Sequence, residues 1–172
     1  FGFFQAKQAI REKDRVVLVE GEMDMISSFM AGVGETVAVK GTALTEDQLK
    51  LIGRLTKNLI LALDADGAGQ EATKRSIEMA EKQGFYVRVV QIKGGKDPDD
   101  VAREVPGKWK KMIEGAMDVY EYYLARAVEK YGEETVEGKR KISEEVIPVV
   151  ARIENEVIKA HFAKKLARIL ET

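Results

Sequence analysis

The chain has 172 residues, 45% of them hydrophobic, and a formal net charge of −1 at pH 7, so it can bury a core but lacks the basic excess of proteins that grip nucleic acid alone. Because cysteine is absent and histidine occurs once, disulfides, thiolate zinc or iron–sulfur sites and a histidine cage are excluded, and any metal must have oxygen ligands. No apolar run approaches the roughly 20 residues of a membrane span, and no secretory signal is evident, so we expect a cytoplasmic protein without a membrane partner.

Four short apolar runs, rich in β-branched residues, alternate with amphipathic stretches in the first two thirds of the chain. They cover residues 15–20, 35–39, 58–63 and 85–92. This alternation predicts strand–helix units around a parallel sheet. The first and third runs are almost wholly apolar, which is typical of strands covered on both faces. We therefore predict an α/β fold, Rossmann-like, with helices flanking a parallel sheet.

Helices are expected between these strands, at residues 23–31, after Thr45, and at residues 68–82. Thr45 and Gln48 have the spacing of a capping box, which marks the start of the second helix. Gly84 is the kind of residue that ends the third. We expect a further helix close to Phe1.

The pattern changes after residue 97, where prolines interrupt it and long helical stretches replace the strands. We place a boundary near Ala116, with an α/β domain at residues 1–115 and a helical subdomain at residues 116–172. Apolar residues at helical spacing predict helices at 117–131, 135–153 and 156–169. Pro148 is predicted to kink or split the second of these helices.

Acidic residues follow three of the apolar runs. Glu20 ends the first run and Asp24 lies one helical turn further on, while Asp64 and Asp66 follow the third. The fourth is followed by the acidic segment 97–100, which contains Asp97 and Asp99. Since ligands of parallel α/β sheets bind at the carboxyl ends of the strands, we expect these carboxylates to share one crevice.

Carboxylates gathered in one crevice require a cation. Two like charges about 4 Å apart repel by roughly 4 kcal/mol at an effective dielectric near 20. Hard divalent ions suit oxygen ligands, and magnesium commonly bridges carboxylates to substrate phosphates. Paired ions favour in-line displacement at phosphorus, and a carboxylate not bound to metal can move a proton.

Each acidic motif alone also has a structural interpretation. An Asp-Xaa-Asp-Gly sequence is most often a turn, and Asp97 before Pro98 can simply begin a helix. The occurrence of acids at three strand ends, with none inside the apolar runs, favours the functional interpretation.

Two basic segments are candidates for phosphate binding. The loop that contains Lys40, Gly41 and Thr42 leads into a helix, whose free amides can hold an anion. A capped turn explains this loop equally well. Lys96 lies beside the acidic segment that follows the fourth strand and is the second candidate.

The motifs together resemble the Toprim domain of bacterial DnaG-type DNA primases, in order and in spacing. The resemblance covers essentially the whole chain and rests on four segments, which read Val-Glu-Gly-Glu-Met-Asp at 19–24, Gly-Thr-Ala-Leu-Thr at 41–45, Asp-Ala-Asp-Gly-Ala-Gly-Gln at 64–70 and Gly-Lys-Asp-Pro-Asp at 95–99. The second and fourth segments are far more specific to primases than the Toprim fold itself. One departure is Glu22, where this family usually has tyrosine.

The resemblance implies a Toprim fold and a DNA-templated polymerase that makes short RNA primers by nucleotidyl transfer with two or more Mg²⁺ or Mn²⁺ ions. Glu20 would be a metal ligand or proton acceptor, and Asp24 would support the site. The remaining metal ligands would be Asp64, Asp66, Asp97 and Asp99, with Glu20, Asp64 and Asp66 the catalytic acids.

The resemblance also implies partners. These are nucleoside triphosphates, a single-stranded DNA template, the RNA–DNA hybrid and a replicative helicase, within the replisome of a bacterial cytoplasm. The zinc-binding domain and the basic subdomain of full primases would precede this segment, so we expect no zinc here. The helicase-binding domain would follow it, and the segment alone would make little or no primer.

Three alternatives remain open from the residues. Another Toprim enzyme, such as a nuclease or a topoisomerase, is one; a topoisomerase would need a nucleophilic tyrosine, whereas the tyrosines after residue 116 look like packing residues. A haloacid-dehalogenase-like phosphatase would use Asp64 as its nucleophile. A non-catalytic docking module would act through the helical tail.

Overall fold

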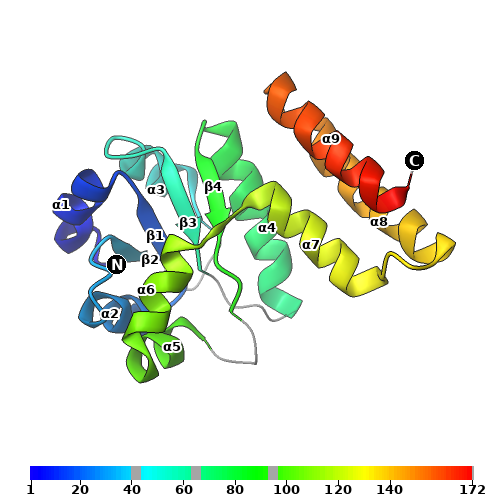
Figure 1. The fold of residues 1–172 in the computed structure, drawn as a ribbon. Coiled ribbons are helices and arrows are strands. Elements are labelled where there is room, and N and C mark those ends of the chain that lie inside the picture. The colour runs from blue at the N-terminus through cyan, green and yellow to red at the C-terminus, as the bar shows by residue number, and fades with distance from the viewer. Residues whose placement is uncertain (40–43, 63–66, 93–96, 172) are drawn as a thin grey trace. The chain divides into compact units, whose positions relative to one another are not determined.

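The computed structural model describes residues 1–39, 44–62, 67–92 and 97–171, with the backbone alone at 67–73 (Figure 1). The chain divides into two compact units, Phe1–Met117 and Asp118–Thr172. The first unit holds an α/β sheet and the second holds helices. The roles given to the two parts, a catalytic domain and a polymerase-core subdomain, stay predictions.

The sheet has strand order β2-β1-β3-β4-β5. Its inner pairings, β1 with β2, β1 with β3, and β3 with β4, are all parallel. The α/β class, with helices flanking a sheet, is therefore confirmed. The strands are β1 (Val16–Val19), β2 (Thr36–Ala38), β3 (Asn58–Leu61), β4 (Tyr86–Val89) and β5 (Met117–Asp118).

The fifth strand corrects the prediction of a helix that begins at Met117. Residues Met117–Asp118 form β5, which makes the sheet mixed, and helix α7 begins at Val119. The Asp118 carboxylate accepts a hydrogen bond from the Tyr120 amide at 2.8 Å and so caps the helix. A strand of two residues has no periodicity of its own, and Met117 also fits the helical spacing that follows.

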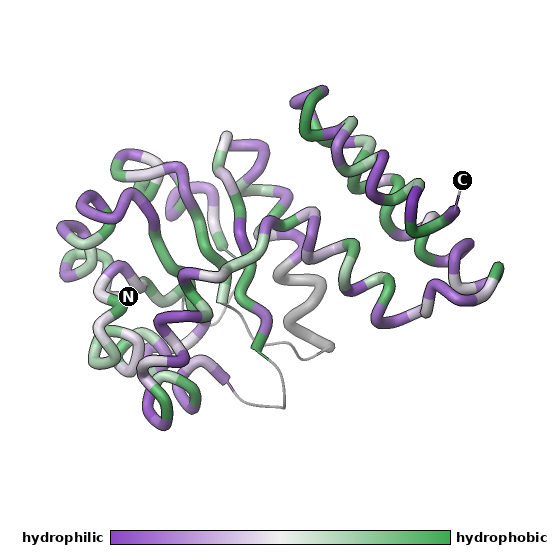
Figure 2. The backbone as a smooth tube through the Cα atoms, viewed as in Figure 1, coloured by the Kyte–Doolittle hydropathy of each residue, from purple (hydrophilic) through white to green (hydrophobic). Residues whose placement is uncertain are grey.

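Strands β1 and β3 are buried, as their apolar runs predict. Figure 2 colours the backbone by hydropathy. All of β1 is buried, as are Leu59, Ile60 and Leu61 of β3. One face of the sheet packs on α2 (Glu22–Met30), α5 (Pro98–Glu104) and α6 (Pro106–Glu114), in a cluster that includes Val17, Ile60 and the fully buried Trp109. Each such large side chain contributes roughly 1.5–3 kcal/mol by its burial.

The other helices of the first unit are α1 (Phe3–Lys13), α3 (Glu46–Ile52) and α4 (Gly67–Lys82). The capping box at α3 is confirmed, since the Gln48 amide donates to Thr45 Oγ1 at 3.3 Å and the Thr45 amide donates to Gln48 Oε1 at 2.9 Å. Gly84, two residues after α4, has a φ of 74°, a left-handed conformation that favours glycine.

The amino edge of the sheet carries a buried ion pair. Glu35, just before β2, is 0% exposed, and its carboxylate lies 2.7 Å from Lys13 Nζ and 2.9 Å from Arg15 Nη2. Lys13 ends α1 and Arg15 precedes β1, so one buried anion joins three segments at this edge.

The second unit consists of α7 (Val119–Tyr131), α8 (Val136–Ala151) and α9 (Glu156–Leu170), packed on a core of Leu124, Ile142, Val146 and Phe162. Pro148 does not split α8, which continues to Ala151. Pro148 and Glu144 are both exposed, so water can satisfy the Glu144 carbonyl that the proline cannot bond. Within the described residues, no helix has the length and apolar content needed to cross a membrane.

Candidate metal centre

Glu20 stands where the strand order reverses. The chain passes from β1 to β2 on one side, whereas β3 pairs with the other side of β1. In open α/β sheets, this reversal opens a crevice at the carboxyl ends of the strands, where ligands bind. Glu20 directly follows the last residue of β1 and is partly buried, so the sheet topology puts it at the position that sequence analysis assigns to a metal ligand or proton acceptor.

Asp24 connects two helix starts at this edge. Its Oδ2 accepts the Gly21 amide at 2.8 Å, just before α2, and its Oδ1 accepts the Asp99 amide at 3.1 Å, in the first turn of α5. Amides at helix starts lack intrahelical partners, and one carboxylate satisfies an amide at each. By accepting these two amides, Asp24 can support the site in the way proposed from the sequence.

Asp24 is only 8% exposed, and its pKa is raised above the ordinary value for aspartate. Burial is the main cause, and the negative charges of Asp97 and Asp99 add to it. The amides of Gly21 and Asp99 oppose the shift by stabilising the carboxylate. A cation bound nearby would stabilise the charged form of this carboxyl group.

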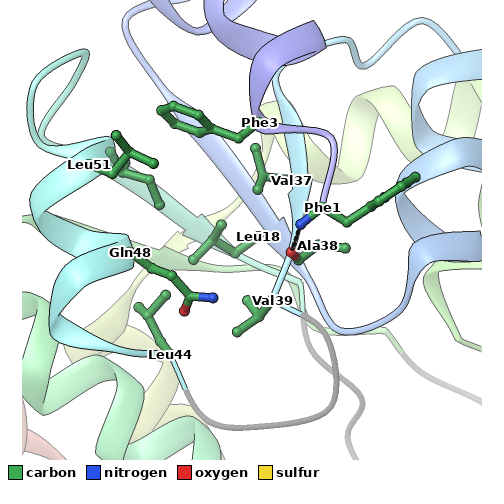
Figure 3. A pocket seen from close by; sticks show the side chains of 10 residues that line it. Phe1, Phe3, Leu18, Val37, Ala38, Val39, Leu44, Gln48 and Leu51 are labelled. Atoms are coloured by element: carbon green, nitrogen blue, oxygen red, sulfur yellow. Dashed lines mark hydrogen bonds between the residues drawn. The ribbon is translucent and has the colours of Figure 1, made fainter.

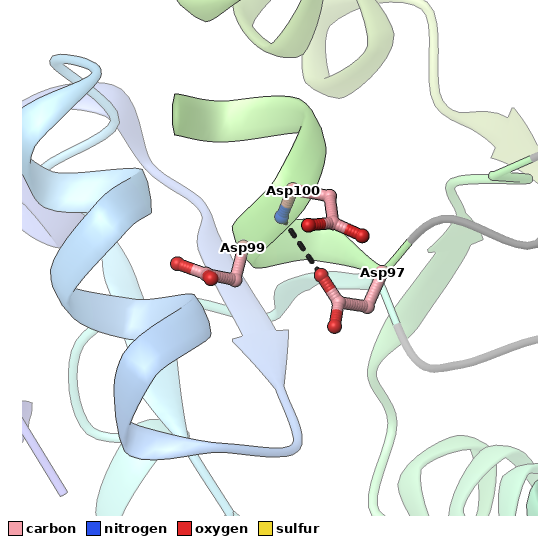
Figure 4. A group of neighbouring side chains, drawn as sticks. All are labelled: Asp97, Asp99 and Asp100. Carbon is pink, nitrogen blue, oxygen red and sulfur yellow. Dashed lines mark hydrogen bonds between the residues drawn. The ribbon is translucent and has the colours of Figure 1, made fainter. Parts of the chain in front are cut away.

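Three carboxylates gather at the start of α5 (Figure 4). Asp97, Asp99 and Asp100 are partly buried, and each offers one oxygen within 4.8 Å of the others. Asp97 is also the N-cap of α5, with its Oδ1 accepting the Asp100 amide at 2.7 Å and Pro98 in the first turn. The structural interpretation of this motif is thus correct, and it coexists with the acidic cluster.

Asp99 is held by neighbours on both of its oxygens. The Ser27 hydroxyl on α2 donates to Oδ1, and Arg103 Nε lies 3.4 Å from Oδ2. Figure 4 shows the Asp99 carboxylate directed toward α2, away from the carboxylates of Asp97 and Asp100. Asp97 and Asp24 make no ion pair within the described residues.

This set of donors fits a divalent cation. It consists of carboxylate oxygens, partly buried and close together, and among the described residues one exposed arginine, Arg103, contacts them. Mg²⁺ and Mn²⁺ prefer oxygen ligands of this kind and keep several waters of their own. The expected ligands Asp97 and Asp99 therefore lie together, and Asp24 touches the amide of Asp99.

Several predicted site residues lie outside the described part of the chain. They are Asp64 and Asp66 of the third strand end, and Lys40, Gly41, Thr42 and Lys96 of the phosphate-binding segments. Their roles stay predictions.

Three residues near the site were not predicted from the sequence: Asp100, Ser27 and Arg103. Asp100 could have been found as the third acid of its segment. Ser27 lies one helical turn after Asp24, a spacing that puts both on one face of α2. Its contact with a residue 72 positions away leaves no local signal in the sequence.

An apolar cavity of about 160 Å³ lies beside the edge strand β2 (Figure 3). Among the described residues its lining includes Phe1, Leu18, Leu44 and Gln48, and none of the described lining residues has a titratable side chain. The Phe1 amino group donates to the Ala38 carbonyl at 2.7 Å beside it. The described lining side chains are apolar apart from Gln48, so this cavity offers mainly packing surface, in contrast to the acidic edge.

Two family models match the chain. The first, described as Toprim-like, covers residues 17–102, half of the chain. This chain belongs to the Toprim-like family, among the DnaG-type primases. The second model is the DnaB-helicase binding domain of primase, and it covers residues 120–172. The matches favour the primase branch over the topoisomerase, nuclease and phosphatase alternatives.

Proteins with similar sequences and structures include DNA primases and their domains. The DNA primase of Halalkalibacterium halodurans is 35% identical over 97% of this chain and 28% of its own length. The structure of a DnaG primase catalytic domain bound to ssDNA matches with a TM-score of 0.78 and 27% identity, over 99% of this chain and 55% of that one. The RNA polymerase domain of Mycobacterium tuberculosis primase DnaG, in complex with double-stranded DNA, matches with a TM-score of 0.82 and 25% identity, over 99% of this chain and 56% of that one.

The chain spans about a quarter of the length of the curated primases that it matches. From the sequence, the helicase-binding region of the primase is expected beyond this chain. The match at residues 120–172 corrects that expectation, because a helicase-binding family is represented within the chain itself.

Proposed function

We propose that this chain is the catalytic-core segment of a DNA primase, which synthesises short RNA primers on a DNA template by nucleotidyl transfer. The observation that supports it best is the clustering of Asp97, Asp99 and Asp100, with Asp24 beside them, at the ligand-binding edge of a Toprim-family sheet. The primases that match along almost the whole chain support the same conclusion.

In this proposal, Glu20, Asp97 and Asp99 hold divalent cations together with Asp64 and Asp66. The bound ions supply charge neutralisation for the phosphates of nucleoside triphosphates. Glu20, at the strand reversal, is the carboxylate best placed to accept a proton from the attacking hydroxyl. Asp24 fixes the starts of α2 and α5, and so holds the acidic residues in register.

A single-stranded DNA template and an RNA–DNA hybrid are the proposed nucleic-acid partners. A DnaG catalytic domain has been seen with ssDNA and a DnaG polymerase domain with double-stranded DNA. The net charge of −1 gives this chain little electrostatic grip of its own. Lys40, Gly41, Thr42 and Lys96 are proposed to meet nucleotide phosphates, and further basic surface must come from other parts of the primase.

A second function, helicase docking, is proposed for the helical unit. The match of residues 120–172 to the DnaB-helicase binding domain of primase favours it. The docking module that sequence analysis left as an alternative to catalysis thus becomes a complement to it. A binding measurement between this chain and a replicative helicase, with and without residues 118–172, tests it.

A manganese titration tests the metal site. We expect electron paramagnetic resonance to show Mn²⁺ binding to the wild-type chain, and the double variant Asp64→Asn with Asp66→Asn to lose it. The double variant Glu46→Gln with Asp47→Asn changes the charge equally on the exposed start of α3 and is the matched control. Equal binding by all three proteins would contradict the proposed site.

A further inference from the structure

We propose that Ser27 is a positioning residue of the metal site, whose hydroxyl holds the Asp99 carboxylate in the orientation that divalent-ion binding requires. This inference rests on the proposed function. In this role Ser27 acts through Asp99, the residue that its hydroxyl contacts.

Helix α2 holds Asp99 at two points. The Ser27 hydroxyl donates to Oδ1 of its side chain, and Asp24, one helical turn earlier, accepts its backbone amide at 3.1 Å. Ser27 is 4% exposed, so water does not compete for this hydrogen bond. Backbone and side chain of Asp99 are therefore both set by one face of α2, which is itself anchored at the end of β1 through Gly21.

The other partner of Asp99 cannot replace this constraint. Arg103 contacts Oδ2 at 3.4 Å, but its side chain is 60% exposed, and exposed ion pairs are weak and mobile. The serine hydroxyl fixes the conformation in which one Asp99 oxygen lies within 4.8 Å of an oxygen of Asp97 and of Asp100. Without the hydroxyl, the carboxylate is free to leave this position. Groups that orient metal ligands in this way typically account for about 10–100-fold in metal affinity.

The chain contains a matched control for this hydroxyl. Ser28 is the next residue on α2, is 0% exposed, and its Oγ has no hydrogen-bond partner in the described part of the chain. Changing either serine to alanine removes one buried hydroxyl from the same helix. Only the change at Ser27 removes a contact with the acidic cluster.

The experiment measures Mn²⁺ affinity by electron paramagnetic resonance for wild type, Ser27→Ala, Ser28→Ala and Ser27→Thr, alongside their thermal unfolding. We expect Ser27→Ala to weaken binding about tenfold, Ser28→Ala to match the wild type, and Ser27→Thr to restore most of the affinity because it keeps the hydroxyl. An unchanged affinity in Ser27→Ala would overturn this role and leave the metal site standing. Absence of Mn²⁺ binding in the wild type would overturn both.

Discussion

Buried acidic residues have different kinds of partner at the two edges of the sheet. At the amino edge, Glu35 is fully buried between the side chains of Lys13 and Arg15. At the carboxyl edge, Asp24 is nearly as buried, yet its two partners are backbone amides. The first arrangement neutralises charge, whereas the second orders the carboxylate and leaves its negative charge in place.

This difference separates stability from function. A neutralised carboxylate gains nothing further from a cation, so Glu35 belongs to the framework of α1, β1 and β2. The ordered carboxylate of Asp24 lies near the negative charges of Asp97 and Asp99, so a bound cation would stabilise it. Substitutions at the amino edge should therefore change the free energy of unfolding, and those at the carboxyl edge should change metal binding and catalysis.

The largest effect is expected from Glu20→Gln in a full-length polypeptide that carries this segment. Loss of the proton acceptor or metal ligand should reduce primer synthesis by about 10²–10⁴-fold, while circular dichroism shows an unchanged fold. Glu22→Gln, two residues on, is the control and should prime at near-wild-type rates. A wild-type rate in Glu20→Gln would contradict the role given to this residue.

Glu35→Gln should lower the free energy of unfolding by about 3 kcal/mol, because it leaves Lys13 and Arg15 without their buried anionic partner. The loss falls at the lower end of the range for buried pairs because Lys13 is 41% exposed and can regain water. Denaturant unfolding measures it. The variant should bind Mn²⁺ with wild-type affinity, and a parallel loss of metal binding would show that the two edges are not independent.

Asp97→Asn should weaken metal binding and leave the free energy of unfolding nearly unchanged. Asparagine caps helices as well as aspartate does, so α5 keeps its start and stability changes by no more than about 0.5 kcal/mol. Removal of a charged ligand should weaken Mn²⁺ binding by more than the roughly tenfold typical of a group that only orients a ligand, as judged by calorimetry. Asp47→Asn, on the exposed start of α3, should leave binding unchanged. A large loss of stability with unchanged affinity would assign Asp97 a capping role alone.

The smallest effect is expected in the helical unit, where acids are paired as at the amino edge. Burial would raise the pKa of Glu145, but hydrogen bonds from Tyr131 and Lys130 hold it below the ordinary value. A lowered pKa stabilises the fold above the unfolded-state pKa of glutamate, and this contribution is lost as pH falls through the folded-state value.

Tyr131→Phe should therefore cost about 1 kcal/mol at neutral pH, and less as the pH falls through the lowered pKa of Glu145. Unfolding curves across this range measure it. Tyr122→Phe, whose hydroxyl makes no hydrogen bond within the described residues, should be neutral. A cost for Tyr131→Phe that does not change with pH would contradict this pairing.

The parts of the molecule that follow from sequence are those with strong local signals. The apolar runs of β1 and β3 predict buried strands because strands covered on both faces must be apolar throughout. The capping box at Thr45 identifies the start of α3 to the residue. The acidic segment 97–100 is recognisable because it follows the fourth apolar run, at a strand end where parallel sheets bind ligands.

The remainder depends on contacts between distant segments. The β5 strand exists because Met117–Asp118 meets a sheet edge, and nothing local distinguishes it from the helix that follows. The bonds that join Asp24 and Ser27 to Asp99 connect positions more than 70 residues apart. Single side chains of common types carry no sequence signal for such contacts, so Ser27 became apparent only in the structure.

The most direct test of a metal-binding carboxyl edge is anomalous scattering from crystals soaked in manganese. We expect peaks at coordination distance, about 2.0–2.2 Å, from oxygens of Asp97 and of at least one further acid among Glu20, Asp64, Asp66 and Asp99, with no peak at Glu35. Absence of anomalous density at this edge, in crystals that hold manganese elsewhere, would contradict the account.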